Sequence, residues 1–149
     1  MPTILIIAHA PLASALKAVA THVYPERARS VAALDVLPDV PVEEIEVQAR
    51  ALLLAASGAE TLVLTDVFGA TPCNAAQRLA DTSQVRVVAG VNVPMLWRCL
   101  CYANESLDAM TARAVSGATH GVMQVASARP QTQTLKPGAN DQDHRHHQQ

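Results

Sequence analysis

Apolar residues gather in four short runs along the first part of the chain, and polar residues, glycine or proline bound each run. The runs cover residues 3–8, 30–36, 61–65 and 85–89. Runs of this length, with apolar residues at nearly every position, are typical of strands that are buried on both faces of a parallel sheet. The pattern therefore predicts four strands, and the one at residues 3–8 is expected to be buried on both faces.

Between these runs, apolar residues recur at spacings of three and four, which predicts amphipathic helices. One helix follows Pro11, a residue suited to a first helical position. Thr71 and Pro72 are interpreted as an N-cap followed by a first-turn proline. The helices expected after the first one cover residues 42–57, 71–79, 95–103 and 107–116.

The alternation of strands and helices indicates an α/β fold with a single doubly wound, mostly parallel sheet and helices on both faces. The strand order 2-1-3-4 is expected, as in flavodoxin-like folds. Residues 121–126 are apolar enough to form one last strand, so we expect one domain over residues 1–126. The remainder, residues 127–149, is rich in Gln, Thr, Asn, Asp and His. This composition predicts a disordered polar tail.

The composition and charge of the chain limit the classes of molecule that we expect it to bind and the location that we expect for it. The 149-residue chain has a net charge of -2 and no basic stripe, so nucleic acid is not an expected partner. Its three cysteines form no paired framework, which favours reduced thiols. The apolar run near the N-terminus is far shorter than the ~20 residues of a membrane span. We therefore expect a cytoplasmic protein.

Two titratable side chains stand at the ends of predicted strands. His9 follows the first strand and Asp66 follows the third. In a sheet of order 2-1-3-4 these strands are neighbours, and ligands bind beyond their carboxyl ends. A histidine that only ends a strand is the simpler interpretation, but the place of Asp66 favours chemistry. Its carboxylate can fix the imidazole tautomer and leave the other ring nitrogen as a nucleophile.

A loop of small residues adjoins this pair. Gly69, Ala70 and Thr71 lead into a predicted helix N-terminus, where free N–H groups and the helix dipole favour an anion. The Thr71 hydroxyl could cap the helix or donate to a phosphoryl oxygen. The sequence thus predicts His9 and Asp66 as catalytic residues and the three loop residues as phosphoryl-binding. No metal site and no cofactor are predicted.

Three segments carry a family resemblance. They are the first strand ending in His9, the segment Thr-Asp-Val-Phe-Gly-Ala-Thr-Pro-Cys-Asn-Ala-Ala around Asp66, and the segment Val-Ala-Gly-Val-Asn-Val-Pro-Met-Leu. Together they resemble the mannose-family enzyme IIA of the bacterial phosphoenolpyruvate-dependent sugar phosphotransferase system. The resemblance runs over residues 3–125 of the chain.

The resemblance implies a phosphotransferase that acts through a phosphohistidine intermediate. His9 would receive phosphate from the phosphocarrier protein HPr and pass it to an enzyme IIB partner, with Asp66 as its hydrogen-bond partner. Thr71 would match the hydroxyl residue of the family's Gly-Gly-Ser-Pro loop. A homodimer is also implied, with the last strand at residues 121–126 exchanged between subunits. Contact with a membrane would be indirect, through permease subunits.

An alternative from another functional class stays open. A stand-alone regulatory protein could bind a target according to the phosphorylation state of His9, because phosphate adds about two negative charges to a surface. A receiver domain phosphorylated on Asp66 is discounted, since the first strand lacks the acidic pair that would hold magnesium. A dinucleotide site lacks its glycine pattern, and a metal hydrolase lacks a third ligand.

Overall fold

The computed structural model describes residues 1–126, and the tail predicted at residues 127–149 lies outside the described residues. Four parallel strands form one sheet in the order β2-β1-β3-β4, which confirms the predicted order. The strands are β1 (Thr3–His9), β2 (Val31–Val36), β3 (Thr61–Thr65) and β4 (Val85–Ala89).

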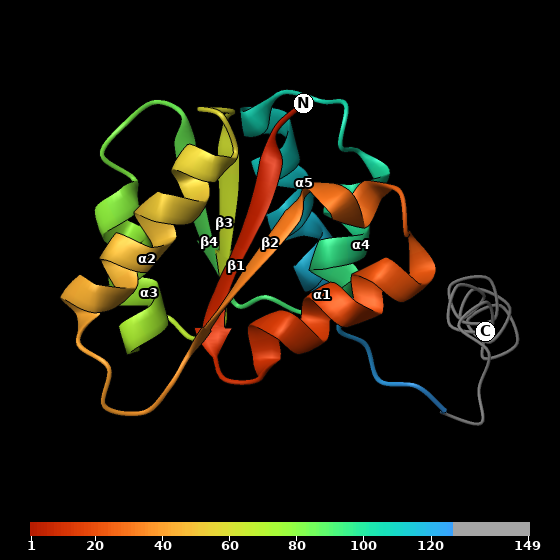
Figure 1. Cartoon of the computed structure of the whole chain (residues 1–149). Helices are drawn as coiled ribbons and strands as arrows, with labels where there is room; N and C mark the ends of the chain where they lie inside the picture. The colour runs from red at the N-terminus through yellow and green to blue at the C-terminus, as the bar shows by residue number, and fades with distance from the viewer. Residues whose placement is uncertain (127–149) are drawn as a thin grey trace, which may run out of the picture.

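Helices cover both faces of this sheet (Figure 1). One group, α2 and α3, packs on one face, while α1, α4 and α5 pack on the other. A short 3-10 turn, η1 (Arg27–Ser30), leads into β2. The helices are α1 (Leu12–Val23), α2 (Val42–Ala55), α3 (Thr71–Leu79), α4 (Val93–Cys101) and α5 (Leu107–His120).

Strand β1 explains why the apolar runs lack polar alternation. Ile4 and Ile6 pack into the core beneath α1, α4 and α5, whereas Leu5 and Ile7 pack into the core beneath α2 and α3. Because successive side chains of a strand point to opposite faces, a strand covered on both sides must be apolar at every position. All four of these side chains are fully buried.

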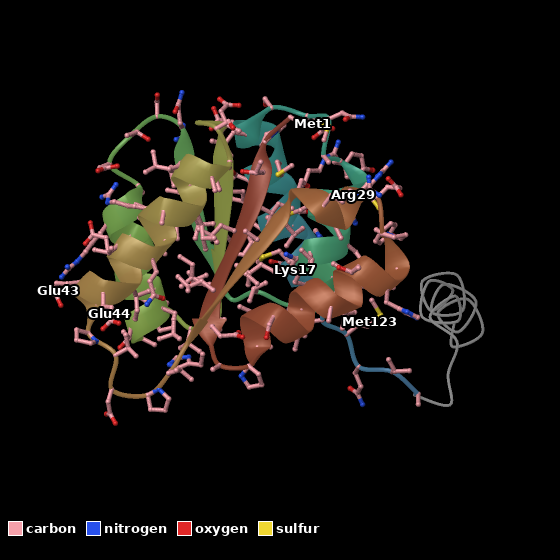
Figure 2. The ribbon with its side chains drawn as sticks, viewed as in Figure 1. Met1, Lys17, Arg29, Glu43, Glu44 and Met123 are labelled. Atoms are coloured by element: carbon pink, nitrogen blue, oxygen red, sulfur yellow. The ribbon has the colours of Figure 1, made fainter. Side chains whose placement is uncertain are left out.

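The sheet brings distant parts of the chain to one edge. In the parallel register Ile7 lies opposite Thr65, so the carboxyl ends of β1 and β3 are neighbours. Met1 precedes β1 and is labelled at the top of Figure 2, which has the same view as Figure 1. The carboxyl ends of β1 and β3 therefore lie at the opposite edge of the sheet, at the bottom of both views. After β1 the chain turns to the α1 face and after β3 to the α3 face. This reversal places the two strand ends at the position where ligands bind in doubly wound sheets.

One predicted local feature is wrong, and a second is not tested by the single chain. The N-cap of α3 is Ala70, and Thr71 is the first helical residue, one position later than the sequence suggested. Residues 121–126, expected as a last strand exchanged between subunits, follow α5, which extends to His120, and pair with no strand of their own chain. A strand needs a neighbour for its backbone hydrogen bonds, and an apolar pattern alone does not supply one.

The described helices also bear on membrane topology. In residues 1–126 we find no helix with both the length and the apolar character that a bilayer crossing requires.

Candidate active site

His9 is the last residue of β1 and the first exposed one after a run of five buried residues. Its side chain is 54% exposed, while the side chain of Asp66 beside it is only 10% exposed. The register that pairs β1 with β3 brings the two residues together across 57 positions of sequence. The structure thus confirms that the predicted pair meets at the carboxyl edge of the sheet.

A single carboxylate oxygen of Asp66 accepts two hydrogen bonds from His9. The ring atom Nδ1 donates to Oδ2 over 2.7 Å, and the backbone amide of His9 donates to the same oxygen over 2.9 Å. Because an ionised carboxylate can only accept, Nδ1 must carry the proton of this bond. In the neutral ring, the other nitrogen, Nε2, therefore keeps a free lone pair.

The environment of Asp66 favours its ionised form. Burial alone would raise the pKa of its carboxyl group, but hydrogen bonds from the backbone and ring of His9 outweigh that effect. The backbone amide of Val67 adds a third bond, donating to Oδ1 over 2.8 Å. The net result is a pKa below the ordinary value for this carboxyl group, so Asp66 is an anion at neutral pH.

The main chain at the end of β3 is also held in place. The amide of Gly90 donates to the carbonyl of Asp66 over 2.8 Å, and the amide of Val91 donates to the carbonyl of Thr65 over 2.9 Å. Gly90 has a φ of 87°, a conformation in which residues with a Cβ are strained. The loop after β4 thereby fixes the carboxylate that orients His9, a role that the sequence pattern alone did not reveal.

The predicted anion-binding loop leads directly from Asp66 into α3. Gly69 adopts a positive φ of 88°, and the side chain of Asn74 donates back to its carbonyl over 3.3 Å. Ala70 occupies the N-cap position with extended backbone, and its side chain has no oxygen to satisfy the first amides of the helix. The N-terminus of α3 therefore presents free N–H groups beside the carboxyl end of β3.

The start of α1 differs in this respect. Oδ1 of Asp35, from β2, accepts a hydrogen bond from the backbone amide of Ser14 over 3.0 Å. A carboxylate thus already serves the first turn of α1, and a second anion there would meet repulsion. Of the two helices that begin next to His9 and Asp66, α3 is the better anion site. Asp35 was not among the site residues predicted from the sequence, although its place near the end of β2 could have indicated it.

An apolar rim adjoins the pair. Phe68 is the only phenylalanine of the chain, and it is 76% exposed in the loop just after Asp66. Val67 is exposed beside it, as is Leu37 after β2. Exposed apolar side chains of this size at one edge of a sheet are typical of a surface that another protein covers.

Metal ions have no evident place within the part of the chain that the structure describes. Among residues 1–126, no group of three or more His, Cys, Asp or Glu side chains converges in a way that could hold an ion. His9 and Asp66 are bonded to each other, with 2.7 Å between Nδ1 of the ring and Oδ2 of the carboxylate.

Comparison with known proteins identifies the family to which this fold and sequence are similar. The model of the EIIA-man family, the PTS system fructose IIA component, matches residues 3–115. Over 64 residues, 41% of this chain, the sequence is 41% identical to the PTS system mannose-specific EIIAB component of Escherichia coli K12. The same identity holds for the component of that name in Shigella flexneri. The matched segment spans 20% of the length of these relatives.

Solved structures share the fold. The mannose/sorbose-specific IIA subunit from Enterococcus faecalis superimposes with a TM-score of 0.78 at 25% identity, over 87% of this chain and 98% of that one. The PTS IIA protein associated with the fucose utilization operon of Streptococcus pneumoniae gives 0.70 at 24%, over 84% and 96%. Because the family model covers most of the chain and the fold agrees, this protein belongs to the mannose-type enzyme IIA family of the sugar phosphotransferase system.

Proposed function

We propose that this protein is a phosphoryl carrier that accepts phosphate from HPr on Nε2 of His9 and passes it to an enzyme IIB partner. The observation that supports this proposal most strongly is the bond from Nδ1 to Asp66. It commits one ring nitrogen to a buried carboxylate and leaves the other free on a half-exposed side chain. Family membership supplies the reaction class. A cytoplasmic location follows as part of the proposal.

The chemical step is a direct exchange between two imidazole rings. The lone pair of Nε2 attacks phosphorus while the bond from phosphorus to the donor's ring nitrogen breaks, and that nitrogen recovers the electron pair. Positive charge develops on the ring of His9, since Nδ1 keeps its proton. Asp66, already ionised and 2.7 Å away, stabilises this charge without rearrangement. Positioning and electrostatics suffice for the step, with no metal in the scheme.

The loop before α3 is proposed to hold the phosphoryl oxygens. Gly69, Ala70 and Thr71 precede and begin a helix whose first amides are uncapped by a side chain. Because Ala70 takes the N-cap position, the Thr71 hydroxyl is not needed as a cap and is available to donate to a phosphoryl oxygen. The positive end of the α3 dipole offsets charge on the transferred group.

A homodimer completes the proposal. Strand β4 is an edge of the sheet, so one row of its backbone groups has no strand beside it. After α5, Val122, Met123 and Val125 are exposed apolar residues outside any strand. This segment, on which Figure 2 labels Met123, runs away from the body of the protein in both views (Figures 1 and 2). Pairing of residues 121–126 with β4 of a second copy would satisfy the edge and bury those side chains.

The experiment that tests the proposal follows phosphate in both directions. Protein labelled from phosphoenolpyruvate, enzyme I and HPr is isolated and mixed with a mannose-type IIB domain. We expect the label to leave His9 and appear on the IIB domain, and to return to HPr when unlabelled HPr is added instead. Labelling without onward transfer to any IIB domain would argue for the regulatory alternative. Absence of labelling would refute both.

A matched pair of loop variants tests the anion site. Thr71→Val removes the hydroxyl and keeps the shape of the side chain. We expect phosphoryl transfer to slow by about tenfold, because the loss of one charge-assisted hydrogen bond changes a rate by about that factor. Thr71→Ser keeps the hydroxyl and should stay within about twofold of the original rate. Equal rates for both variants would remove the hydroxyl from the mechanism.

A further inference from the structure

A second pocket lies on the helical face of the molecule, apart from His9 and its loop. It opens between the end of α1, the outer side of α4 and the end of α5, and its volume is about 400 Å³. None of the residues that line it belongs to the phosphoryl site. They are Tyr24, Pro94, Trp97, Arg98, Cys101, Tyr102, Gly117, His120 and Gly121.

Aromatic rings form one wall of this pocket. Tyr24 and Trp97 meet edge to face, with ring centroids 5.6 Å apart and planes 89° from parallel. Both side chains are half-buried, as is Tyr102. Rings fixed in this way offer flat apolar surface and phenol groups at the same place. A wall of this kind suits a ligand with a planar or ring-shaped body.

Arg98 supplies an uncommitted positive charge. Among the arginines in residues 1–126 it is the one whose guanidinium makes neither a salt bridge nor a hydrogen bond, although Arg113 next to it is paired with Glu105. Its guanidinium carbon lies 6.0 Å from the centroid of the Tyr102 ring. Its stem packs against Gly117, where an added Cβ would come within 2.8 Å. Packing thus holds the base of the Arg98 side chain beside the pocket.

Nothing acidic offsets this charge within the lining, which contains no Asp or Glu. A further cation lies close by, because Arg27 donates to the carbonyls of Leu100 and Cys101 over 2.8 Å and 3.1 Å. His120 commits its Nδ1 to the carbonyl of Ser116 over 2.9 Å, which leaves Nε2 free. The electrostatic character of the pocket is therefore positive, and its shape and walls are aromatic.

We propose that this pocket binds a small organic anion, a carboxylate or phosphate monoester carried on a ring. The anionic group pairs with Arg98, and the ring packs against the wall formed by Tyr24 and Trp97. Arginine is suited to this role because its planar fork matches both anion geometries. The pocket is separate from the phosphoryl site, since it shares no residue with the pair His9 and Asp66.

The single tryptophan of the chain makes the test direct. Trp97 lines the pocket, so intrinsic fluorescence reports occupancy without a label. The full chain is titrated with phenyl phosphate and with benzoate, and separately with phenol and inorganic phosphate. We expect saturable changes with the first two probes, at least tenfold weaker binding of phenol, which lacks the charge, and weaker binding of inorganic phosphate, which lacks the ring. The relative response to phenyl phosphate and benzoate tells which anion the site prefers.

Matched variants assign the contact. Arg98→Gln keeps the stem that packs on Gly117 but removes the charge, and phenyl phosphate should then bind at least tenfold more weakly. Arg86→Gln, at a surface ion pair with Asp108, should bind as the original chain does, and so should His9→Ala. Thermal unfolding checks that each variant is folded. The proposal would be overturned if Arg98→Gln bound phenyl phosphate as tightly as the original chain. It would also be overturned if neither ring-bearing anion gave a saturable change in fluorescence, or if the change followed protein concentration and not ligand concentration.

Discussion

The ring of His9 and the carboxylate of Asp66 are joined by a 2.7 Å hydrogen bond, although 57 residues separate them in sequence. The backbone amide of His9 donates to the same oxygen over 2.9 Å. This double attachment fixes both the position and the orientation of the carboxylate relative to the ring. It therefore defines which ring nitrogen is left free of the carboxylate.

Removing the charge of Asp66 should slow transfer and leave the fold intact. In Asp66→Asn an amide oxygen can still accept from Nδ1, but the negative charge that stabilises the cationic ring is lost. We expect phosphoryl transfer from HPr to fall on the order of 10- to 100-fold, since charge-assisted bonds are about twice as strong as neutral ones. Rapid-quench kinetics measure this rate.

Asp35→Asn is the matched control for that variant. Its carboxylate also lies at the carboxyl edge of the sheet but serves the first turn of α1. Transfer by Asp35→Asn should stay within about threefold of the original rate while stability falls, because only a helix-terminal interaction is weakened. Equal slowing in the two variants would mean that general negative charge at this edge matters, and not the specific bond to His9.

Acid should weaken the folded state partly through Asp66. Its carboxyl group has a lower pKa in the folded protein than the ordinary value, so its contribution to stability is fully present above about pH 4 to 5 and is lost as pH falls through the folded pKa. Urea unfolding of the original chain and of Asp66→Asn measures this directly. We expect the difference between their unfolding free energies to be largest near neutral pH and to shrink toward pH 3. A difference that grows on acidification would reverse the assigned direction.

Substitution of threonine by valine is expected to have opposite effects on stability at two positions of β3. The hydroxyl of Thr65 is fully buried and has no hydrogen-bond partner among the described residues. Thr61, also buried, donates to the carbonyl of Ala59 over 3.1 Å and bonds the Thr3 hydroxyl over 2.9 Å. Thr65→Val should leave stability unchanged or raise it by about 1 kcal/mol, whereas Thr61→Val should lower it by about 1 kcal/mol.

Chemical denaturation of the two variants gives the comparison. A clear loss of stability in Thr65→Val would reveal a partner, such as an ordered water, for the buried hydroxyl. Transfer kinetics on the same protein show whether this residue, next to Asp66 in sequence, also affects the site.

The contact between α4 and α5 predicts a reversal of ordinary helix propensity. Alanine normally stabilises a helix by about 1 kcal/mol relative to glycine. At Gly117, however, a Cβ would lie 2.8 Å from Cβ of Arg98 and 3.3 Å from the carbonyl oxygen of Pro94. Gly117→Ala should therefore destabilise the protein by about 1 to 3 kcal/mol, the usual cost of overpacking.

An exposed position of the same helix supplies the control. Ala112→Gly should cost about 1 kcal/mol through propensity alone, which would demonstrate that α5 responds normally where it faces solvent. Stabilisation by Gly117→Ala in thermal melts would mean that the two helices pack less closely than the structure describes.

Much of the fold could be predicted because the apolar runs mark the positions of the strands. The buried strands must be apolar at every position, and the strand-helix alternation leaves few topologies, so the strand order and the meeting of His9 with Asp66 followed from sequence. The loop at Gly69 was recognised for the same reason, since it stands between a strand and a helix.

Features that depend on neighbours distant in sequence could not be predicted in this way. Residues 121–126 are apolar like a strand, but a strand also needs a neighbour for its backbone hydrogen bonds, and this segment pairs with no strand of its own chain. The amide of Gly90 reaches the carbonyl of Asp66 only through the folded arrangement of the loop after β4. The N-cap was misassigned because Thr71 has the stronger local preference, whereas the loop geometry places Ala70 there.

We propose that phosphate is carried on Nε2 of His9. Labelling of the purified chain from phosphoenolpyruvate, enzyme I and HPr tests this directly. Phosphorus and proton NMR of the product identify the bonded ring atom, and acid and base treatment identify the bond type. We predict an acid-labile, base-stable phosphohistidine at Nε2 that is absent in His9→Ala. A label that persists in His9→Ala, or an acyl phosphate on Asp66, would contradict the account.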